Sequence, residues 1–202
     1  MKPRGLLLDF GGVLTTEIWD SFDAFCRAEG LPEDTVRRLF RDDPDALADL
    51  RLLETGEIDE TEFSARFGPR LGIERSEGLI ERLFGGLAPE EVVIEAVREQ
   101  RSRGVRTGLI SNSWGTGIYE PRMLEELFDA VVISGDVGFH KPQPEIYLLG
   151  AERIAVEPAA CVFVDDLREN VAGAEVVGMT AILHRDPAAT VARIEELFGE
   201  AG

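Results

Sequence analysis

A short apolar run near the N-terminus leads into one acidic residue and two glycines, in GLLLDFGGVLTT over residues 5–16. The run does not alternate and turn formers bound it, so it predicts a short strand buried on both faces. In an open parallel sheet, such a strand would deliver Asp9 at its carboxyl end, where these sheets bind ligands. Gly11 and Gly12 would let the backbone turn sharply beside Asp9. An ordinary strand with an aspartate cap explains the stretch equally well, so the rest of the chain has to decide.

Residues 17–86 carry apolar side chains at helical spacing and show no strand pattern. Glu33 and Asp34 suit the first turn of a helix that Pro32 opens. Trp19 and Phe22 are either core of this unit or wall of a pocket. The spacing predicts helices over residues 17–30, 32–40, 45–53, 60–67 and 75–84, with a turn at 54–59.

From Pro89 onward, strand and helix patterns alternate. The predicted strands are 105–111, 130–134, 160–165 and 179–183, and the predicted helices are 90–103, 122–127, 144–153, 170–177 and 190–198. This alternation predicts an α/β fold with a parallel sheet covered on both faces. The strand before Asp9 must join the sheet, because a lone buried strand cannot satisfy its backbone groups. We therefore expect a core of residues 1–16 and 87–202, with residues 17–86 inserted as a helical cap.

The composition narrows the range of partners. The 202 residues, 44% hydrophobic and 30% charged, suit one compact domain with an inserted lobe. A net charge of -18 argues against nucleic acid and against an anionic membrane surface. Cys26 and Cys161 form no ligand pattern, and no apolar signal segment or membrane span is visible, so we expect a cytoplasmic protein. Lysine occurs only at Lys2 and Lys141, which suggests that Lys141 supplies the compact point charge that Arg lacks.

Polar residues end the predicted strands. Asp9 follows the first, Ser111 the next, and Asp165 with Asp166 the strand at 160–165, while Lys141 follows the strand at 130–134. If the strands are parallel, all of these side chains meet at one edge of the sheet. A carboxylate nucleophile, a hydroxyl, a lysine and a carboxylate pair together describe a metal-assisted phosphoryl-transfer site.

These motifs resemble, in the same order, those of the haloacid dehalogenase-like hydrolase superfamily: LLLDFGGVL, GLISNS, GFHKPQPEIY and VFVDD. The resemblance spans essentially the whole chain and points to the helical-cap subgroup, which includes sugar phosphatases and the N-terminal domains of epoxide hydrolases. It implies a Rossmann-like three-layer core with a cap, an aspartate nucleophile, Mg²⁺ and phosphatase activity on a small phosphorylated metabolite. It leaves the identity of the substrate and the oligomeric state open.

The resemblance also implies roles for the catalytic residues. Asp9 would attack phosphorus and form an aspartyl-phosphate that water hydrolyses. Ser111 would hydrogen-bond a phosphoryl oxygen, and Lys141 would neutralise charge on Asp9 and the phosphoryl group. The charged form of Lys141 would be favoured between carboxylates. Ordinary capping would also explain these residues, with Ser111 as a strand-end cap and Asp165 and Asp166 as the N-cap of the following helix.

Binding roles follow from the same resemblance. The expected Mg²⁺ ligands are Asp9, the Gly11 carbonyl, Asp165 and Asp166, although the sequence does not say which of the acidic pair ligates directly. Substrate and phosphate would contact Gly11, Gly12, Asn112 and Trp114. We expect the Trp114 ring to face the cap.

One position departs from the common pattern of the family. The residue two after the nucleophile is usually a second aspartate that protonates the leaving group, and here it is Gly11. General acid–base help is worth about 10²–10⁴-fold, or roughly 3–5 kcal/mol. Its loss favours substrates with good leaving groups, unless water or a cap residue substitutes.

The Gly11 departure and the family leave two alternatives. One is a metal-independent 2-haloacid dehalogenase, which the pair Asp165 and Asp166 disfavours. The other is a non-catalytic ligand-binding protein that kept the metal site. The Mg²⁺-dependent phosphatase is the interpretation that the sequence favours.

Overall fold

The computed structural model describes residues 2–115 and 117–199. Its sheet is five-stranded and wholly parallel, in the order β3-β2-β1-β4-β5. The strands are β1 (Gly5–Leu8), β2 (Arg106–Ser111), β3 (Ala130–Ile133), β4 (Cys161–Asp165) and β5 (Thr180–Leu183). The strand before Asp9 is thus the central one, with a parallel neighbour on each side. This confirms the predicted parallel sheet and the place of the first strand in it.

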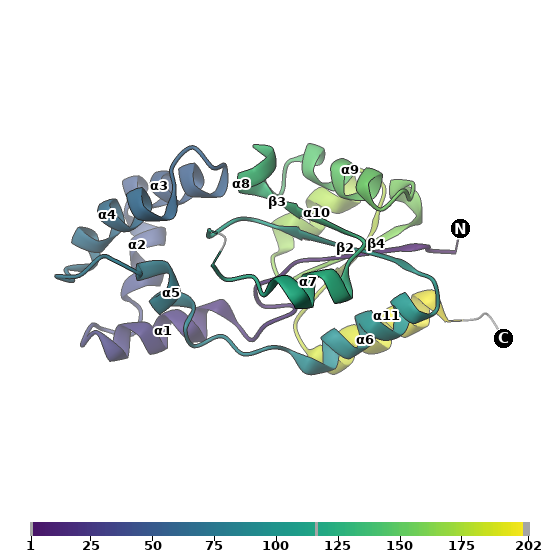
Figure 1. Cartoon of the computed structure of the whole chain (residues 1–202), viewed down its shortest axis with the longest axis horizontal. Coiled ribbons are helices and arrows are strands. Elements are labelled where there is room, and N and C mark those ends of the chain that lie inside the picture. The colour runs from purple at the N-terminus through teal and green to yellow at the C-terminus, as the bar shows by residue number, and fades with distance from the viewer. Residues whose placement is uncertain (1, 116, 200–202) are drawn as a thin grey trace.

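Helices cover both faces of the sheet, as predicted (Figure 1). One face packs against α6 (Glu91–Ser102), α7 (Pro121–Leu127) and α11 (Pro187–Phe198), and the other against α9 (Pro144–Arg153) and α10 (Arg168–Val176). In β1, Leu6 and Leu8 belong to the first of these apolar cores and Leu7 to the second. The non-alternating run is therefore apolar because both of its faces are buried.

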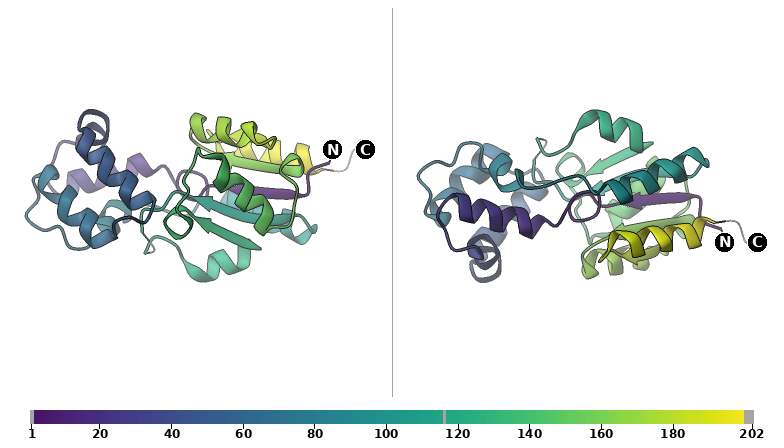
Figure 2. Two further views of the ribbon diagram at one scale, coloured as in Figure 1. Left: turned by 90° about the horizontal axis from the view of Figure 1, so that it is seen from above. Right: turned by 90° about the horizontal axis from the view of Figure 1, so that it is seen from below.

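The segment between β1 and α6 forms a separate helical cap with its own apolar core. Its helices are α1 (Ile18–Ala28), α2 (Thr35–Asp42), α3 (Pro44–Glu54), α4 (Glu60–Leu71) and α5 (Leu79–Phe84). Figures 1 and 2 show the cap beyond one end of the sheet, with the start of β1 and the end of α11 at the other end. The chain enters and leaves the cap by adjacent segments, since Thr16 N donates to Ala88 O at 2.9 Å.

Several predicted boundaries are wrong by a few residues. The second helix begins at Thr35 and not at Pro32, because residues 32–35 form a turn closed by a bond from Thr35 N to Pro32 O. The helix predicted from Arg75 begins at Leu79, because Gly78 has a left-handed φ of 62°. The third predicted strand ends at Ile133, since Ser134 opens α8 (Ser134–Val137), which is too short to show a periodic pattern. A 3₁₀ turn at Pro158–Ala160 precedes β4.

The described residues, 2–115 and 117–199, contain no helix that is both long and apolar enough to cross a membrane.

Candidate active site

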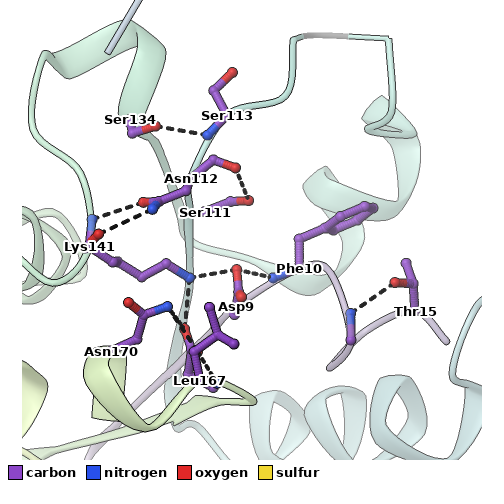
Figure 3. A network of polar contacts seen from close by, with 12 residues as sticks. Asp9, Phe10, Thr15, Ser111, Asn112, Ser113, Ser134, Lys141, Leu167 and Asn170 are labelled. Atoms are coloured by element: carbon purple, nitrogen blue, oxygen red, sulfur yellow. Dashed lines mark hydrogen bonds and ion pairs between the residues drawn. The ribbon is translucent and has the colours of Figure 1, made fainter. Parts of the chain in front are cut away.

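A buried lysine joins two of the predicted site carboxylates. Lys141 is 3% exposed, and its Nζ lies 2.6 Å from Asp9 Oδ1 and 2.8 Å from Asp165 Oδ2 (Figure 3). Burial alone would lower the pKa of Lys141, but the carboxylates of Asp165 and Asp9 outweigh it, so the pKa lies above its ordinary value. The lysine is therefore charged, and it holds the ends of β1 and β4 together.

Asp9 leaves the sheet immediately after β1, where its own backbone N–H still donates to Val164 O at 2.9 Å. Its Oδ1 accepts from Phe10 N at 2.7 Å in addition to the pairing with Lys141. Among the described residues, both of these polar partners of the carboxylate bind Oδ1. The other oxygen, Oδ2, is thus the one available to a ligand in the cavity that Asp9 lines.

Asp165 is fully buried and held rigidly at the end of β4. Its Oδ1 accepts from Leu167 N at 2.8 Å, and Asn170 Nδ2 donates to its two oxygens at 3.0 and 3.1 Å. The contact with Leu167 N, just ahead of α10, is the cap-like role that the sequence left open for this pair. The same carboxylate also binds Lys141, so Asp165 links the start of α10 to the lysine.

The three acidic residues fit a divalent cation. Carboxylate oxygens of Asp9, Asp165 and Asp166 lie within 4.8 Å of one another, and oxygen is the donor that Mg²⁺ prefers. Burial, opposed by Lys141, raises the pKa of Asp9 to about 7, and burial followed by the charge of Asp165 raises that of Asp166 to about 6. Burial thus disfavours the charged form of these carboxylates, which a bound cation would stabilise.

Ser111 and Asn112 lie at the end of β2, next to Asp9 and Lys141 (Figure 3). Ser111 Oγ accepts a hydrogen bond from Tyr119 OH at 2.9 Å. The Asn112 side chain clamps the backbone of Lys141: its Oδ1 accepts from Lys141 N at 2.8 Å and its Nδ2 donates to Lys141 O at 3.2 Å. Asn112 therefore positions the lysine through its side chain, in addition to the substrate or phosphate contact expected of it.

Gly11 and Gly12 follow Asp9 in the turn. Gly12 has a φ of 73°, a left-handed conformation that favours glycine, and a Cβ there would make a tight contact of 3.0 Å with Asp166 Oδ2. A Cβ on Gly11 would lie only 2.3 Å from Cδ1 of Ile18, at the start of α1. An apolar cap side chain thus occupies the space where the common acid/base residue would begin.

A cavity of about 260 Å³ separates this cluster from the cap. Trp114 lines it, and its ring contacts the cap rings of Phe22, Phe40, Phe63 and Phe84, at centroid distances of 5.4, 5.7, 6.1 and 5.3 Å. Trp114 therefore faces the cap, as expected from the sequence. Trp19 and Phe22 line the same cavity, and Phe22 is also fully buried, so the two roles left open for it are both filled.

All the site residues predicted from the sequence line this cavity except Gly12 and Asp165, which lie directly behind it against Asp166 and Lys141. Sequence reasoning missed Ile18, Glu54, Tyr119 and Asn170, which contact the site from helices and from the loop after β2. Only Asn170 had a usable signal, because it is an amide in the first turn of the helix that follows the acidic pair.

Fold and site together define an α/β protein that gathers carboxylates, a lysine and a hydroxyl at the carboxyl edge of a parallel sheet, beneath a helical cap. The family model for haloacid dehalogenase-like hydrolases matches residues 3–178, and the chain belongs to this family. The resemblance inferred from the motifs is thereby confirmed, and the protein is a hydrolase.

Relatives of several kinds are similar to this chain. Phosphatase MT3486 of Mycobacterium tuberculosis is 29% identical over 91% of this chain and 88% of its own length. Sesquiterpene phosphatase astK of Aspergillus oryzae is 28% identical over 72% of this chain and 77% of its own. Bifunctional epoxide hydrolase 2 of Rattus norvegicus is 28% identical over 53% of this chain, which corresponds to only 21% of that longer protein.

A solved structure shares the fold. It is a haloacid dehalogenase family enzyme of Bacteroides thetaiotaomicron, an Asp-to-Ala mutant in complex with magnesium and inorganic phosphate. It superposes with a TM-score of 0.70 at 18% identity, covering 91% of this chain and 94% of its own.

Proposed function

We propose that this protein is a Mg²⁺-dependent phosphatase that hydrolyses a small phosphorylated metabolite through an aspartyl-phosphate on Asp9. The observation that carries the proposal is the Lys141 ammonium, 2.6 Å from Asp9 and 2.8 Å from Asp165, with Asp166 beside them below a cavity. The names of two relatives, a phosphatase and a sesquiterpene phosphatase, support the same reaction class.

In the first step, Asp9 Oδ2 forms a bond to phosphorus and the bond from phosphorus to the leaving oxygen breaks. Lys141 holds the other oxygen of Asp9, which fixes the direction of attack, and offsets charge on the phosphoryl group. The Ser111 hydroxyl and the Asn112 backbone N–H lie at the adjacent strand end to bind phosphoryl oxygens. In the second step, water attacks phosphorus, releases phosphate and restores the Asp9 carboxylate.

Asp9, the Gly11 carbonyl, Asp165 and Asp166 would hold the metal ion. Bound there, a divalent cation supplies Lewis-acid stabilisation of charge on the phosphoryl oxygens. Asn170 and Leu167 N hold Asp165 in place for this task.

Residues 17–86 act in this proposal as the cap, and residues 1–16 and 87–202 as the catalytic core. The cap encloses the cavity above Asp9 and so limits the access of water to the phosphoryl group. Because no side chain stands at Gly11, the leaving group takes its proton from water, and good leaving groups are favoured.

Substitution of the nucleophile tests the proposal. Asp9→Asn should lower Mg²⁺-dependent phosphate release from an aryl phosphate by at least about 10³-fold, since covalent catalysis needs the carboxylate. Asp42→Asn changes an exposed carboxyl at the end of α2 in the same way and should leave turnover unchanged. Equal turnover by wild type and Asp9→Asn would refute the role of Asp9. Chloride release from a 2-haloacid that survives a chelator would indicate dehalogenation instead.

A further inference from the structure

The cavity above Asp9 is chemically divided. Its core side carries the polar cluster of Asp9, Ser111, Asn112 and Lys141. Its cap side is apolar and is lined by Trp19, Phe22, Phe40, Leu47, Leu50 and Phe84. A molecule that places a phosphate against Lys141 therefore projects the rest of its structure between hydrocarbon and aromatic surfaces.

These apolar walls are packed and do not depend on loose surface chains. The Trp114 ring lies against Phe22, Phe40 and Phe84 at centroid distances of 5.3 to 5.7 Å. Trp19 contacts Phe22 edge-on at 5.6 Å. Rings held by one another in this way keep their shape when a ligand binds, so the wall is preorganised for an apolar group.

Polar partners for a substrate are almost absent from the cap side. Of the described cap residues that line the cavity, Glu54 has the one charged side chain, the indole N–H of Trp19 is the one other side-chain polar group, and none is Lys, Arg or His. Burial raises the pKa of Glu54. A hydroxyl-rich sugar would give up its hydrogen bonds to water here without replacement, and a second phosphate would find no cation.

The space beside Gly11 is apolar as well. Ile18 lies against it and also lines the cavity, so an apolar side chain borders the reacting end itself. The apolar lining therefore continues from the cap to within one residue of the turn that carries Asp9.

We propose that the substrate is a phosphate monoester of an apolar alcohol or phenol, whose hydrocarbon group lies between Trp19, Trp114 and the α2–α3 side chains Phe40, Leu47 and Leu50. The inference rests on the phosphatase activity proposed above and specifies its substrate class. The cavity of about 260 Å³ lies just below the usual range for ligand sites, which suits a ring or short branched chain.

A matched pair of substrates tests the class. Cyclohexylmethyl phosphate and glucose 6-phosphate both carry a six-membered ring and a primary phosphate ester, so the missing acid at Gly11 affects both similarly. The apolar ester should show a kcat/KM at least tenfold higher with the Mg²⁺-loaded wild-type protein. Equal or faster hydrolysis of glucose 6-phosphate would overturn the inference and leave the proposed phosphatase intact.

One substitution checks that the cap wall is responsible. Leu47 is half-buried, lines the cavity and lies outside the apolar core of the cap. Leu47→Gln should reduce the preference for the apolar ester by about fivefold, with little change for glucose 6-phosphate. The matched control is Leu148→Gln on α9, an exposed leucine outside the cavity, which should keep the full preference. An unchanged preference in Leu47→Gln would count against the inference.

Binding gives a readout that does not need turnover. The chain has two tryptophans, Trp19 and Trp114, and both line the cavity, so their fluorescence reports its occupancy. In the Asp9→Asn protein with Mg²⁺, cyclohexylmethyl phosphate should change this emission with a dissociation constant at least tenfold lower than that of glucose 6-phosphate. If the apolar ester binds preferentially but the wild type does not hydrolyse it, the proposed phosphatase activity is wrong and the proposed ligand class stands. If the two esters bind equally well, the proposed ligand class is wrong.

Discussion

At the scale of single residues, the pair Gly11 and Ile18 would set the leaving groups of the proposed phosphatase. The Asp9 carboxylate, the lysine and the acidic pair are assembled, but the position that commonly carries the proton donor has no side chain. Ile18 fills the adjacent space, with its Cδ1 at 2.3 Å from where a Cβ would stand. A proton donor can therefore be added only if the isoleucine yields.

Restoring that donor is a direct test. The double variant Gly11→Asp with Ile18→Ala should raise kcat about tenfold or more for cyclohexylmethyl phosphate, because general acid help is worth about 10²–10⁴-fold in adapted sites. The gain should be small for p-nitrophenyl phosphate, whose leaving group needs little protonation. Ile18→Ala alone is the control for the change in cavity shape. Equal gains on both esters would contradict the proton-donor explanation.

At the scale of elements, the end of α3 and the start of α8 fix the cap to the core. Ser134 Oγ accepts from Ser113 N at 2.8 Å and donates to Glu54 O. Gly56, in the turn after α3, approaches the backbone so closely that a Cβ there would lie 2.4 Å from Gly135 O. The cap wall that includes Leu47 and Leu50 therefore depends on a glycine-to-glycine contact.

Substitutions at two cap glycines distinguish the effect of this contact from that of ordinary backbone strain. Gly56 and Gly72 have φ values of 73° and 75°, but a Cβ on Gly72 would meet nothing within 4 Å. Gly72→Ala should cost only the left-handed strain, roughly 1–2 kcal/mol of unfolding free energy, and keep its activity. Gly56→Ala should cost more and also lower kcat/KM by about fivefold or more, because α3 must move away from α8. Urea unfolding and steady-state kinetics measure both effects. Indistinguishable variants would argue against the contact.

The elements also show what the sequence could predict. The strand-end residues Asp9, Ser111 and Asp165 were identifiable because parallel strands of known polarity bring their ends to one edge, whatever the strand order. Glu54 and Ile18 were not, because a cap helix reveals its apolar face but not how that face is placed over a distant sheet. The start of α5 was missed for a local reason: Gly78 interrupts an otherwise periodic stretch. The order of the strands needed the structure.

At the scale of the whole molecule, the large negative charge governs how stability responds to cations. The chain carries a net charge of -18, and it concentrates three carboxylates around one lysine at the site. Long-range repulsion and the local excess both oppose folding, and any cation relieves the first while only a bound ion relieves the second. Any salt is therefore expected to raise the stability of this protein. The informative quantity is the stabilisation by Mg²⁺ beyond that given by NaCl at the same ionic strength.

Mg²⁺ should stabilise this protein beyond matched ionic strength. At about 100 times its dissociation constant, a ligand that binds only the folded state adds about 2.7 kcal/mol, which for a chain of this size raises Tm by roughly 5–10 °C. The Tm measured in MgCl₂ is compared with the Tm measured in NaCl of equal ionic strength.

Two variants locate the ion. Asp166→Asn removes one carboxylate from the cluster, so its metal-free Tm should not fall, while its Mg²⁺-dependent rise in Tm should drop to less than half of the wild-type value. Asp42→Asn makes the net charge less negative by the same amount at an exposed position, and it should keep the full Mg²⁺-dependent rise in Tm. If Asp166→Asn keeps it as well, the cation acts by general screening, and the cluster of Asp9, Asp165 and Asp166 is not its site.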